Sequence, residues 1–266
     1  MDKDASERSK SVSSKSSTDR YWNQRAITEP DPAKVNMPDT VQRDFELTFV
    51  FKHLWRAARL AEIGCGNGYV TEQLRSRVAH VDSFDYAENM IERARMTYGE
   101  TNNRFFLDNV LEPKNIKGPY DVALCVRVLM NLRDLGEQKI ALCNIAHMLR
   151  PGGRLILIEG FRDGFDALDS FRKAIDLAPL IPSAHNFYSY LADILPTINE
   201  HFLVEQTWHT GLYDFLTRVV FPQLVGAENA TRPGDFHFKI EPIVRANAWP
   251  DMARFARVHG FALARR

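Results

Sequence analysis

The sequence has few cysteines, no excess charge of either sign and no long apolar run. Its three cysteines, Cys65, Cys125 and Cys143, are far apart and form no Cys-x-x-Cys pair, which argues against a disulfide framework or a zinc site. Lys+Arg and Asp+Glu both number 34, whereas a surface for nucleic acid or an acidic membrane would favour basic residues. No stretch approaches the roughly 20 apolar residues of a membrane span, and the start of the chain lacks the apolar core of a secretory signal. We therefore expect a cytoplasmic protein with neither a membrane nor a nucleic acid as partner.

The composition and the first residues divide the chain into a core and its attachments. With 266 residues, a 45% hydrophobic fraction and four Trp, the chain can bury a full core, so we expect one domain overall with an appended cap. Residues 1–19 are rich in Ser and Lys, which predicts a disordered tail. Residues 20–57 are predicted to form a lid and a helix. Three prolines and two aromatic anchors fill 20–38, and apolar residues at helical spacing follow, with Thr40 as the N-cap.

Short apolar runs alternate with helical patterns through the middle of the chain. Strands are predicted at 59–63, 78–84, 104–107, 120–126 and 154–159. Helices are predicted between them, at 67–77, 87–98 and 134–149. Two further runs, 201–208 and 261–265, are candidates to complete the sheet. Strand–helix alternation with short connections predicts an α/β domain, with a parallel sheet covered by helices on both faces.

This alternation also sets the internal boundaries of the domain. The core spans 58–160, and 161–200 is longer than a crossover needs, so it is predicted to be a cap insertion. Residues 201–266 hold the final strands, with a second insertion at 211–250. Ligands of open α/β sheets bind beyond the carboxyl ends of the strands, so these insertions are expected to build a substrate cap.

The stretch "AEIGCGNG" places glycines 64, 66 and 68 on alternate positions, directly after the first strand. A dinucleotide-binding turn reads Gly-x-Gly-x-x-Gly, and its third glycine would fall on Tyr69. The spacing therefore differs from that fingerprint by one residue. A purely structural turn remains the alternative.

Acidic residues surround this turn. Glu62 precedes it, and Asp85 closes the second strand 21 residues after Gly64, an offset at which a carboxylate accepts from two ribose hydroxyls. Asp108 ends the third strand, where it either accepts from an adenine amino group or caps a turn. The pattern favours an adenosine-containing ligand.

Four motifs, "AEIGCGNG", "DYAENMIERAR", "FFLDNV" and "LRPGGRLILIEG", occur in this order. Together they resemble the class I (Rossmann-like) S-adenosylmethionine-dependent methyltransferases, most closely over residues 58–160. The resemblance implies a seven-stranded sheet with an antiparallel last strand, and S-adenosyl-L-methionine as the cofactor across its carboxyl edge. In that family the glycine turn passes the methionine portion of the cofactor and binds no phosphate.

The resemblance also implies a set of cofactor-binding residues: Tyr21, Trp22, Arg25, Glu62, Gly64, Cys65, Gly66, Gly68, Asp85, Tyr86, Met90, Asp108, Asn109, Val110, Cys125, Val126 and Arg127. Asp85 would hold the ribose, Asp108 the adenine amino group, and the amides of Asn109 and Val110 the ring edge. Glu62 would orient the loop or reach the cofactor amine. Residues 125–127 would line the methyl-transfer side, although Arg127 has pairing with a helix carboxylate as its alternative.

The lid is the weaker part of this resemblance. Tyr21, Trp22 and Arg25 resemble an aromatic-plus-Arg segment in which the Arg clamps the cofactor carboxylate. We expect residues 20–38 to order over the cofactor. The alternative is that Trp22 docks permanently against the first helix.

Methyl transfer from a sulfonium is an in-line displacement, so alignment supplies much of the rate. A hydroxyl acceptor needs a general base, and His185 and His209 are the candidates; each also has a structural interpretation. No acidic cluster follows the fourth strand, so no metal is expected. That strand also lacks the Asn/Asp-Pro-Pro-aromatic box of DNA amino-methyltransferases.

We therefore predict methyl transfer to an oxygen or nitrogen of a small molecule. The segments "RVLMNLRDLGEQ" and "GLYDFLTRVVFP" resemble enzymes of bacterial glycan or natural-product pathways. Two alternatives stay open: an NAD(P)-dependent oxidoreductase, and a methyltransferase-like binding protein without activity. The oligomeric state also stays open, a homodimer included.

Overall fold

The computed structural model describes residues 17–230, 233–247 and 249–266. Residues 1–16 of the predicted disordered tail lie outside this range. The remaining three residues of that prediction, 17–19, are helical instead, because α2 spans Ser17–Thr28. Thr18 and Ala26 of this helix are buried against the rest of the domain, and this packing orders its first turn.

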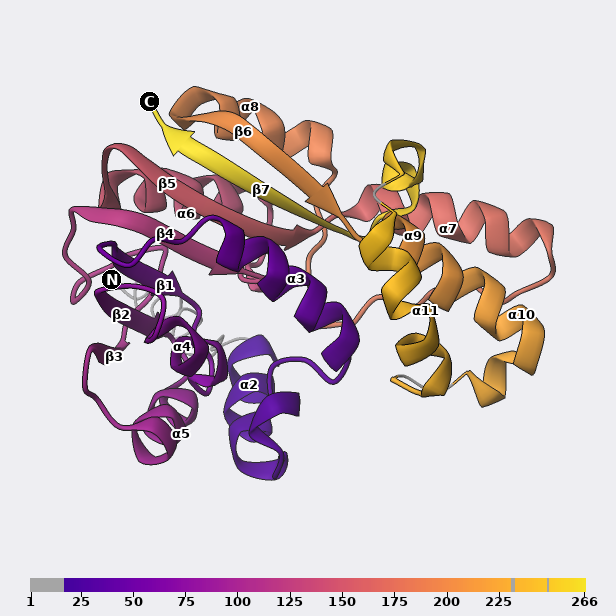
Figure 1. Ribbon diagram of the computed structural model, residues 1–266, viewed down its shortest axis with the longest axis horizontal. Helices are drawn as coiled ribbons and strands as arrows, with labels where there is room; N and C mark the ends of the chain where they lie inside the picture. Colours follow the sequence, from indigo (N-terminus) through magenta and orange to yellow (C-terminus); the bar gives the residue numbers. More distant parts are fainter. Residues whose placement is uncertain (1–16, 231–232, 248) are drawn as a thin grey trace, which may run out of the picture.

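A seven-stranded sheet of order β3-β2-β1-β4-β5-β7-β6 forms the centre of the domain (Figure 1). Neighbours among β1 to β5 are parallel, and β7 is antiparallel to both β5 and β6. This arrangement confirms the predicted Rossmann-like sheet with an antiparallel last strand. The strands are β1 Arg59–Ile63, β2 His80–Asp85, β3 Asn103–Leu107, β4 Tyr120–Val126, β5 Leu149–Gly160, β6 Phe202–His209 and β7 Val258–Arg265.

The central strands are apolar on both sides because helices cover both faces of the sheet. In β4, Val122 and Leu124 pack into a core cluster on one face, together with Phe49 and Val50 of the N-terminal helix α3. Ala123 and Cys125 alternate with them and pack into the cluster on the other face, which α6 and α8 cover. The predicted cofactor residue Cys125 is therefore a core residue with 0% exposure.

Helices around the sheet are α3 Thr40–Lys52, α4 Tyr69–Leu74, α5 Glu88–Tyr98, α6 Leu135–Met148 and α8 Leu191–His201. The lobe that projects beyond the ends of β6 and β7 consists of α7 Arg162–Ala174, α9 Gly211–Phe215, α10 Phe221–Val225 and α11 Asp235–Ala246 (Figure 1). A π-helical turn joins α9 to α10 at Leu216–Val220. The lobe and α8 come from the two predicted insertions.

Two predicted helix boundaries were wrong. Asp39, not Thr40, is the N-cap of α3, because its carboxylate accepts from the Gln42 amide. The same helix ends at Lys52 rather than at 57. No helix in the described part of the chain is both long and apolar enough to cross a membrane.

Candidate active site

A cleft opens at the carboxyl ends of β1, β2, β3 and β4. The strand order of the sheet reverses here, between β1 and β4. This edge is where ligands of open α/β sheets bind. Below, the "floor" is the part of the cleft from residues 58–160, and the "roof" is the part from residues 17–57. The lining residues are Trp22, Asn36, Met37, Arg43, Glu46, Glu62, Ile63, Gly64, Cys65, Gly66, Val70, Phe84, Asp85, Tyr86, Met90, Asp108, Asn109, Val110, Leu124, Val126, Arg127, Val128, Met130, Asn131 and Leu132.

The glycine turn brings bare backbone into the cleft. Gly64 and Gly66 both adopt positive φ, 68° and 55°, a region that favours glycine. A Cβ on Gly64 would lie 2.4 Å from Cγ2 of Val128, and one on Gly66 would lie 2.3 Å from the Asn36 side chain. Gly68 differs, because it starts α4 against Phe105 and does not line the cleft. Two of the three predicted glycines are therefore in the site, and the third is structural.

Asp85 holds this turn in place from the end of β2. Its Oδ2 accepts from the Gly66 amide and its Oδ1 from the Ala87 amide, each at 2.9 Å. The carboxyl is 8% exposed, and burial raises its pKa. Each carboxylate oxygen has a further lone pair, so the group can still accept from a ligand in the cleft.

Glu62 lies at the cleft, where one of its carboxylate oxygens accepts hydrogen bonds from the protein and the other accepts none from the described residues. Oε2 accepts from the hydroxyls of Thr71 and Ser83. Oε1 accepts from no group of the described residues, and Glu62 lines the cleft. Burial raises its pKa to about 7, while the two hydroxyl donors oppose the shift.

Asp108 lines the cleft but is occupied by its own loop. Its two oxygens accept from the backbone amides of Asn109, Lys114, Asn115 and Ile116 at 2.7–3.1 Å. A carboxylate offers about four lone-pair positions, so this geometry favours the turn-capping alternative over the adenine amino group. The Asn109 amide is likewise committed, whereas the Val110 amide donates to no acceptor in the described residues.

The end of β4 places a strained residue beside the cleft. Arg127 has φ 57°, an unusual value for a residue with a side chain. Its guanidinium donates to both oxygens of Glu46 on α3, the shortest bond being 2.6 Å. Glu46 is 1% exposed and also accepts from Gln42. Pairing with a helix carboxylate, the alternative for Arg127, is thus what the structure shows, although both partners line the cleft.

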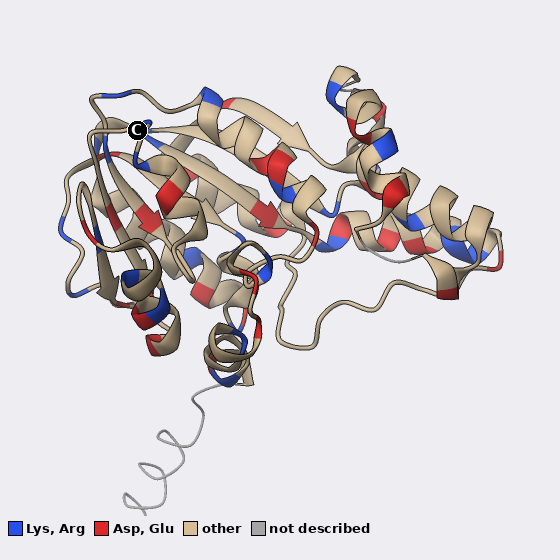
Figure 2. Ribbon diagram, turned by 60° about the horizontal axis from the view of Figure 1, so that its bottom comes forward, with Lys and Arg blue, Asp and Glu red and all other residues tan. Residues whose placement is uncertain are grey.

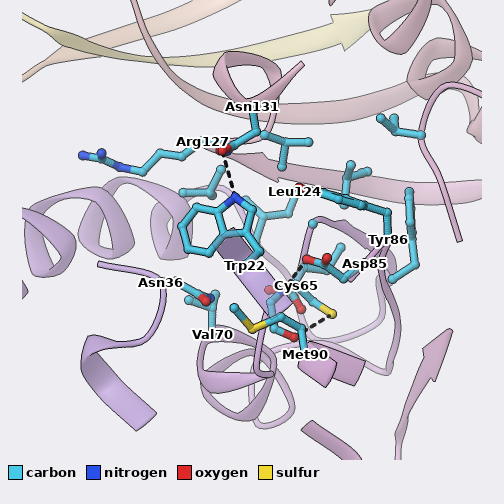
Figure 3. Close-up of a pocket in the computed structure, with 18 of the residues that line it drawn as sticks. Trp22, Asn36, Cys65, Val70, Asp85, Tyr86, Met90, Leu124, Arg127 and Asn131 are labelled. Carbon is cyan, nitrogen blue, oxygen red and sulfur yellow. Dashed lines mark hydrogen bonds between the residues drawn. The ribbon is translucent and has the colours of Figure 1, made fainter. Parts of the chain in front are cut away.

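Trp22 stands in the middle of the cleft, with Asn36, Asp85 and Met90 on one side of it and Asn131 on the other (Figure 3). Its indole Nε1 donates to Oδ1 of Asn131 at 2.9 Å. The ring also packs against the apolar cluster that contains Met90. Trp22 is therefore a cleft residue, as the lid prediction required.

The other two predicted lid residues do not line the cleft. Arg25 donates to the carbonyls of Lys34 and Val35 and pairs with Glu29 at 3.4 Å. These contacts stabilise the turn that follows α2. The structure therefore places Arg25 away from the cleft, and its role as a carboxylate clamp stays a prediction. Tyr21 stacks on His185 with ring centroids 3.9 Å apart.

Neither predicted catalytic histidine lines the cleft. His209 ends β6, and its Nδ1 accepts from the Gly211 amide at 3.2 Å. It faces a second hollow, between α3, β6 and α11. His185 lies in the loop before α8, and burial lowers the pKa of both rings.

The prediction missed a polar stripe on α3. Asp39, Gln42, Arg43 and Glu46 follow the i, i+3, i+4, i+7 spacing of one helix face, and none exceeds 9% exposure. The same helix carries buried apolar residues on its other faces. Polar residues at helical spacing between apolar ones are the signal that could have identified Arg43 and Glu46.

Three buried polar atoms at or beside the glycine turn have no hydrogen-bond partner among the described residues: Oδ1 of Asn67 in the turn, and Oδ1 of Asn36 and Nε of Arg43, whose residues line the cleft. The carboxylate nearest to that nitrogen, Asp44, is 4.0 Å away. The Arg43 guanidinium donates through Nη1 to the Ala33 carbonyl and lies 4.5 Å over the Tyr69 ring. Buried polar groups are normally hydrogen-bonded, so the cleft lacks one donor and one acceptor beside the turn.

Residues 60–153 match the protein family described as "Methyltransferase domain". The chain is 34% identical over 119 residues to malonyl-[acyl-carrier protein] O-methyltransferase of Bacillus anthracis, covering 44% of this chain and 43% of that protein. It is 28% identical over 133 residues to ubiquinone biosynthesis O-methyltransferase of Xylella fastidiosa, covering 48% and 52%. The chain thus spans about half the length of these curated relatives.

Two solved structures share the fold across almost the whole chain. The N-methyltransferase NodS from Bradyrhizobium japonicum, in complex with S-adenosyl-L-homocysteine, is 14% identical with a TM-score of 0.58, covering 94% of this chain and 99% of its own. Magnesium protoporphyrin IX methyltransferase from Synechocystis, with the same ligand bound, is 17% identical with a TM-score of 0.57, covering 94% and 95%. At these identities the likeness shows the fold.

Proposed function

We propose that this chain, which carries a methyltransferase domain over residues 60–153, transfers the methyl group of S-adenosyl-L-methionine to an oxygen or nitrogen of a small molecule. One observation carries the proposal. The glycine turn, held open by Asp85, lies in a cleft at the carboxyl edge of a methyltransferase fold. This arrangement suits a ligand that passes close to the backbone of Gly64 and Gly66.

The residues around the turn fit the aminoacyl end of the cofactor. Oε1 of Glu62 and Oδ1 of Asn36 are unused acceptors, which suit an ammonium group. Nε of Arg43 is an unused cationic donor, which suits a carboxylate. Arg43 therefore takes the place that was predicted for Arg25, from the next helix along the chain.

The rest of the floor fits the nucleoside. Asp85 has lone pairs left for ribose hydroxyls, and Val110, whose amide donates to no acceptor among the described residues, lines the same cleft. Tyr86 and Met90 supply apolar surface on the same side of the cleft.

The bound cofactor would supply a methyl group on a sulfonium that is already electrophilic. The task left to the chain is to align that group with the acceptor and to exclude water, for which positioning is worth roughly 7–11 kcal/mol. Trp22, tied to Asn131, covers the cleft and restricts water. Alignment depends on the glycine turn below it.

We assign to Glu46 the role of accepting the proton that the methyl acceptor loses, because neither His185 nor His209 lines the cleft. Its Oε1 accepts from Gln42 and twice from Arg127, whereas its Oε2 accepts only from Nε of Arg127. The less occupied oxygen can accept from an acceptor O–H or N–H. An amine or hydroxyl therefore suits this side of the cleft, because either group can donate to that oxygen.

The surface charge also supports a small acceptor rather than a nucleic acid. Lys/Arg and Asp/Glu are mixed along the helices of the domain (Figure 2), and both classes number 34 in the sequence. A phosphate backbone selects for clustered cations. No described residue of the two insertions lines the cleft, so their role as a substrate cap stays a prediction.

Isothermal titration with S-adenosylmethionine, S-adenosylhomocysteine and NAD⁺ tests the cofactor. We expect the first two to bind and NAD⁺ not to bind; binding of NAD⁺ alone would establish the oxidoreductase alternative. A methyl-transfer screen with radiolabelled cofactor against sugars, phenols and amines then tests activity. Cofactor binding without transfer to any class would favour the binding-protein alternative.

A further inference from the structure

His185 joins the cap to the roof of the cleft through aromatic contacts. It lies in the loop between α7 and α8, more than 150 residues after α2 in the chain. Its ring stacks on Tyr21 with an interplanar angle of 20° and a centroid distance of 3.9 Å. It also meets the edge of Trp22 at 5.7 Å, and its carbonyl accepts from the Thr18 hydroxyl at 3.2 Å.

The three rings form one unit, because Tyr21 and Trp22 are in edge contact with each other at 4.9 Å. Trp22 is the member of this unit that lines the cleft. His185 lies behind it and outside the cleft, so it has no direct contact with the reacting groups. The ring contacts of His185 reach the cleft through Trp22.

The two ends of α2 are fastened to different parts of the molecule. Toward its C-terminal end, Asn23 accepts from the Asn89 amide, and Arg93 donates to the carbonyls of Ala26 and Glu29. Asn89 and Arg93 belong to α5, which is part of the floor. The first turns of α2, in contrast, contact the loop that contains His185.

We propose that His185 is a positioning residue that holds the first turns of α2, and with them Trp22, closed over the cleft. The loop that contains His185 is itself fastened to the floor, because the Phe187 amide donates to the Met130 carbonyl at 2.7 Å. This inference rests on the proposed function in taking S-adenosylhomocysteine as the ligand under the roof. It assigns to the His185 ring a packing role in place of the predicted role as a base.

The test compares wild type with His185→Ala, which removes the ring, and His185→Phe, which keeps it. His147→Ala, on the exposed side of α6, is the control for loss of a histidine. We expect the Kd of S-adenosylhomocysteine, measured by isothermal titration, to rise about 10-fold in His185→Ala, since two aromatic contacts are lost. His185→Phe and His147→Ala should remain within about 2-fold of wild type by the same measurement.

Trypsin digestion gives a second readout that needs no ligand. Cleavage after Arg20 and Arg25 should be several-fold faster in His185→Ala than in wild type or His185→Phe. Equal cleavage in all four proteins, with equal Kd, overturns the inference. Loss of affinity in His185→Phe as large as in His185→Ala also overturns it, because the ring alone would then be insufficient.

The two proposals fail in different ways. If wild type binds no S-adenosylhomocysteine, the proposed function is wrong, while the difference in trypsin cleavage still decides the role of His185. If His185→Ala does not fold by circular dichroism, His185→Leu takes its place, since it keeps the volume and removes the aromatic ring.

Discussion

The floor and the roof of the cleft recognise a ligand by different means. The floor contributes backbone from the glycine turn and two carboxylates that hold their own loops, Asp85 and Asp108. The roof contributes side chains, among them Trp22, Arg43 and Glu46. The floor coincides with the segment that matches the methyltransferase family, 60–153, and the roof lies outside it.

This contrast shows how the two parts are constrained. A backbone turn requires glycine at fixed positions, so it leaves a readable spacing in the sequence. A side chain can reach the cleft from many helices, as Arg43 does in place of Arg25, and it leaves no fixed spacing. The glycine turn of the floor is therefore readable from the sequence, whereas the side chains of the roof are not.

Asp85 gives the largest expected effect, and it tests the floor. Asp85→Ala removes the acceptor for the Gly66 amide and the expected acceptor for the ribose. Charge-assisted hydrogen bonds are worth roughly 1.5–3 kcal/mol each, so the Kd of S-adenosylhomocysteine should rise at least about 100-fold by isothermal titration. Asp121→Asn, at the opposite edge of the sheet, is the control and should bind like wild type. Unchanged affinity in a folded Asp85→Ala protein would falsify the ribose assignment.

Arg43 gives the next effect, and it tests the roof. Arg43→Ala removes the buried donor with no partner, so the cofactor carboxylate loses about 1.5–3 kcal/mol of binding. The Kd of S-adenosylhomocysteine should rise roughly 10- to 100-fold. Arg25→Ala is the matched variant and should change the Kd by less than about 3-fold. The opposite ranking of these two variants would restore Arg25 as the clamp.

Glu62 gives a smaller effect on stability rather than on affinity. Its pKa in the folded protein is about 7, above its ordinary value of 4.5, so the folded state binds the extra proton between these values. The associated stability is fully present below pH 4.5 and is lost as the pH rises through about 7. Glu62→Gln should therefore reduce the loss of unfolding free energy between pH 5 and pH 8 by about 1–3 kcal/mol in urea titrations. If the unfolding free energies of wild type and Glu62→Gln change in parallel with pH, burial does not raise the pKa of Glu62.

Metal removal should have no effect on either part of the cleft. The described residues contain no group of three or more His, Cys, Asp or Glu that could hold a metal ion. Methyl transfer, once an acceptor is found, should keep its rate after dialysis against EDTA. A rate that falls after dialysis and returns when Mg²⁺ is added would show that the bound acceptor completes a metal site.

Much of the floor could be predicted from the sequence. The first strand was placed at its observed bounds, Arg59–Ile63, because an apolar run and a glycine turn both mark it. The glycine spacing placed Gly64 and Gly66 at the cleft, and the offset of 21 residues from Gly64 placed Asp85 there. Asp108 shows the limit: a carboxylate after a strand can bind a ligand or four amides of its own loop, and the sequence does not distinguish the two.

The roof was predicted less well because its contacts join distant parts of the chain. Trp22 binds Asn131, 109 residues later, and Glu46 binds Arg127, 81 residues later. No local pattern encodes such a pairing. His185 was selected as a base because it lies in the predicted cap, yet its partner is an aromatic ring that only the folded chain brings near.

The pairing of Arg127 with Glu46 has a consequence for how the chain can change over generations. A left-handed backbone costs a residue with a side chain roughly 1–2 kcal/mol, so glycine at 127 would relieve strain. It would also leave the Glu46 carboxylate buried without its cation, a loss of about 3–5 kcal/mol. The reverse order, replacing Glu46 first, leaves both the strain and an unpaired guanidinium. Each single replacement therefore lowers the stability of the fold, and only replacing both residues together avoids an unpaired buried charge.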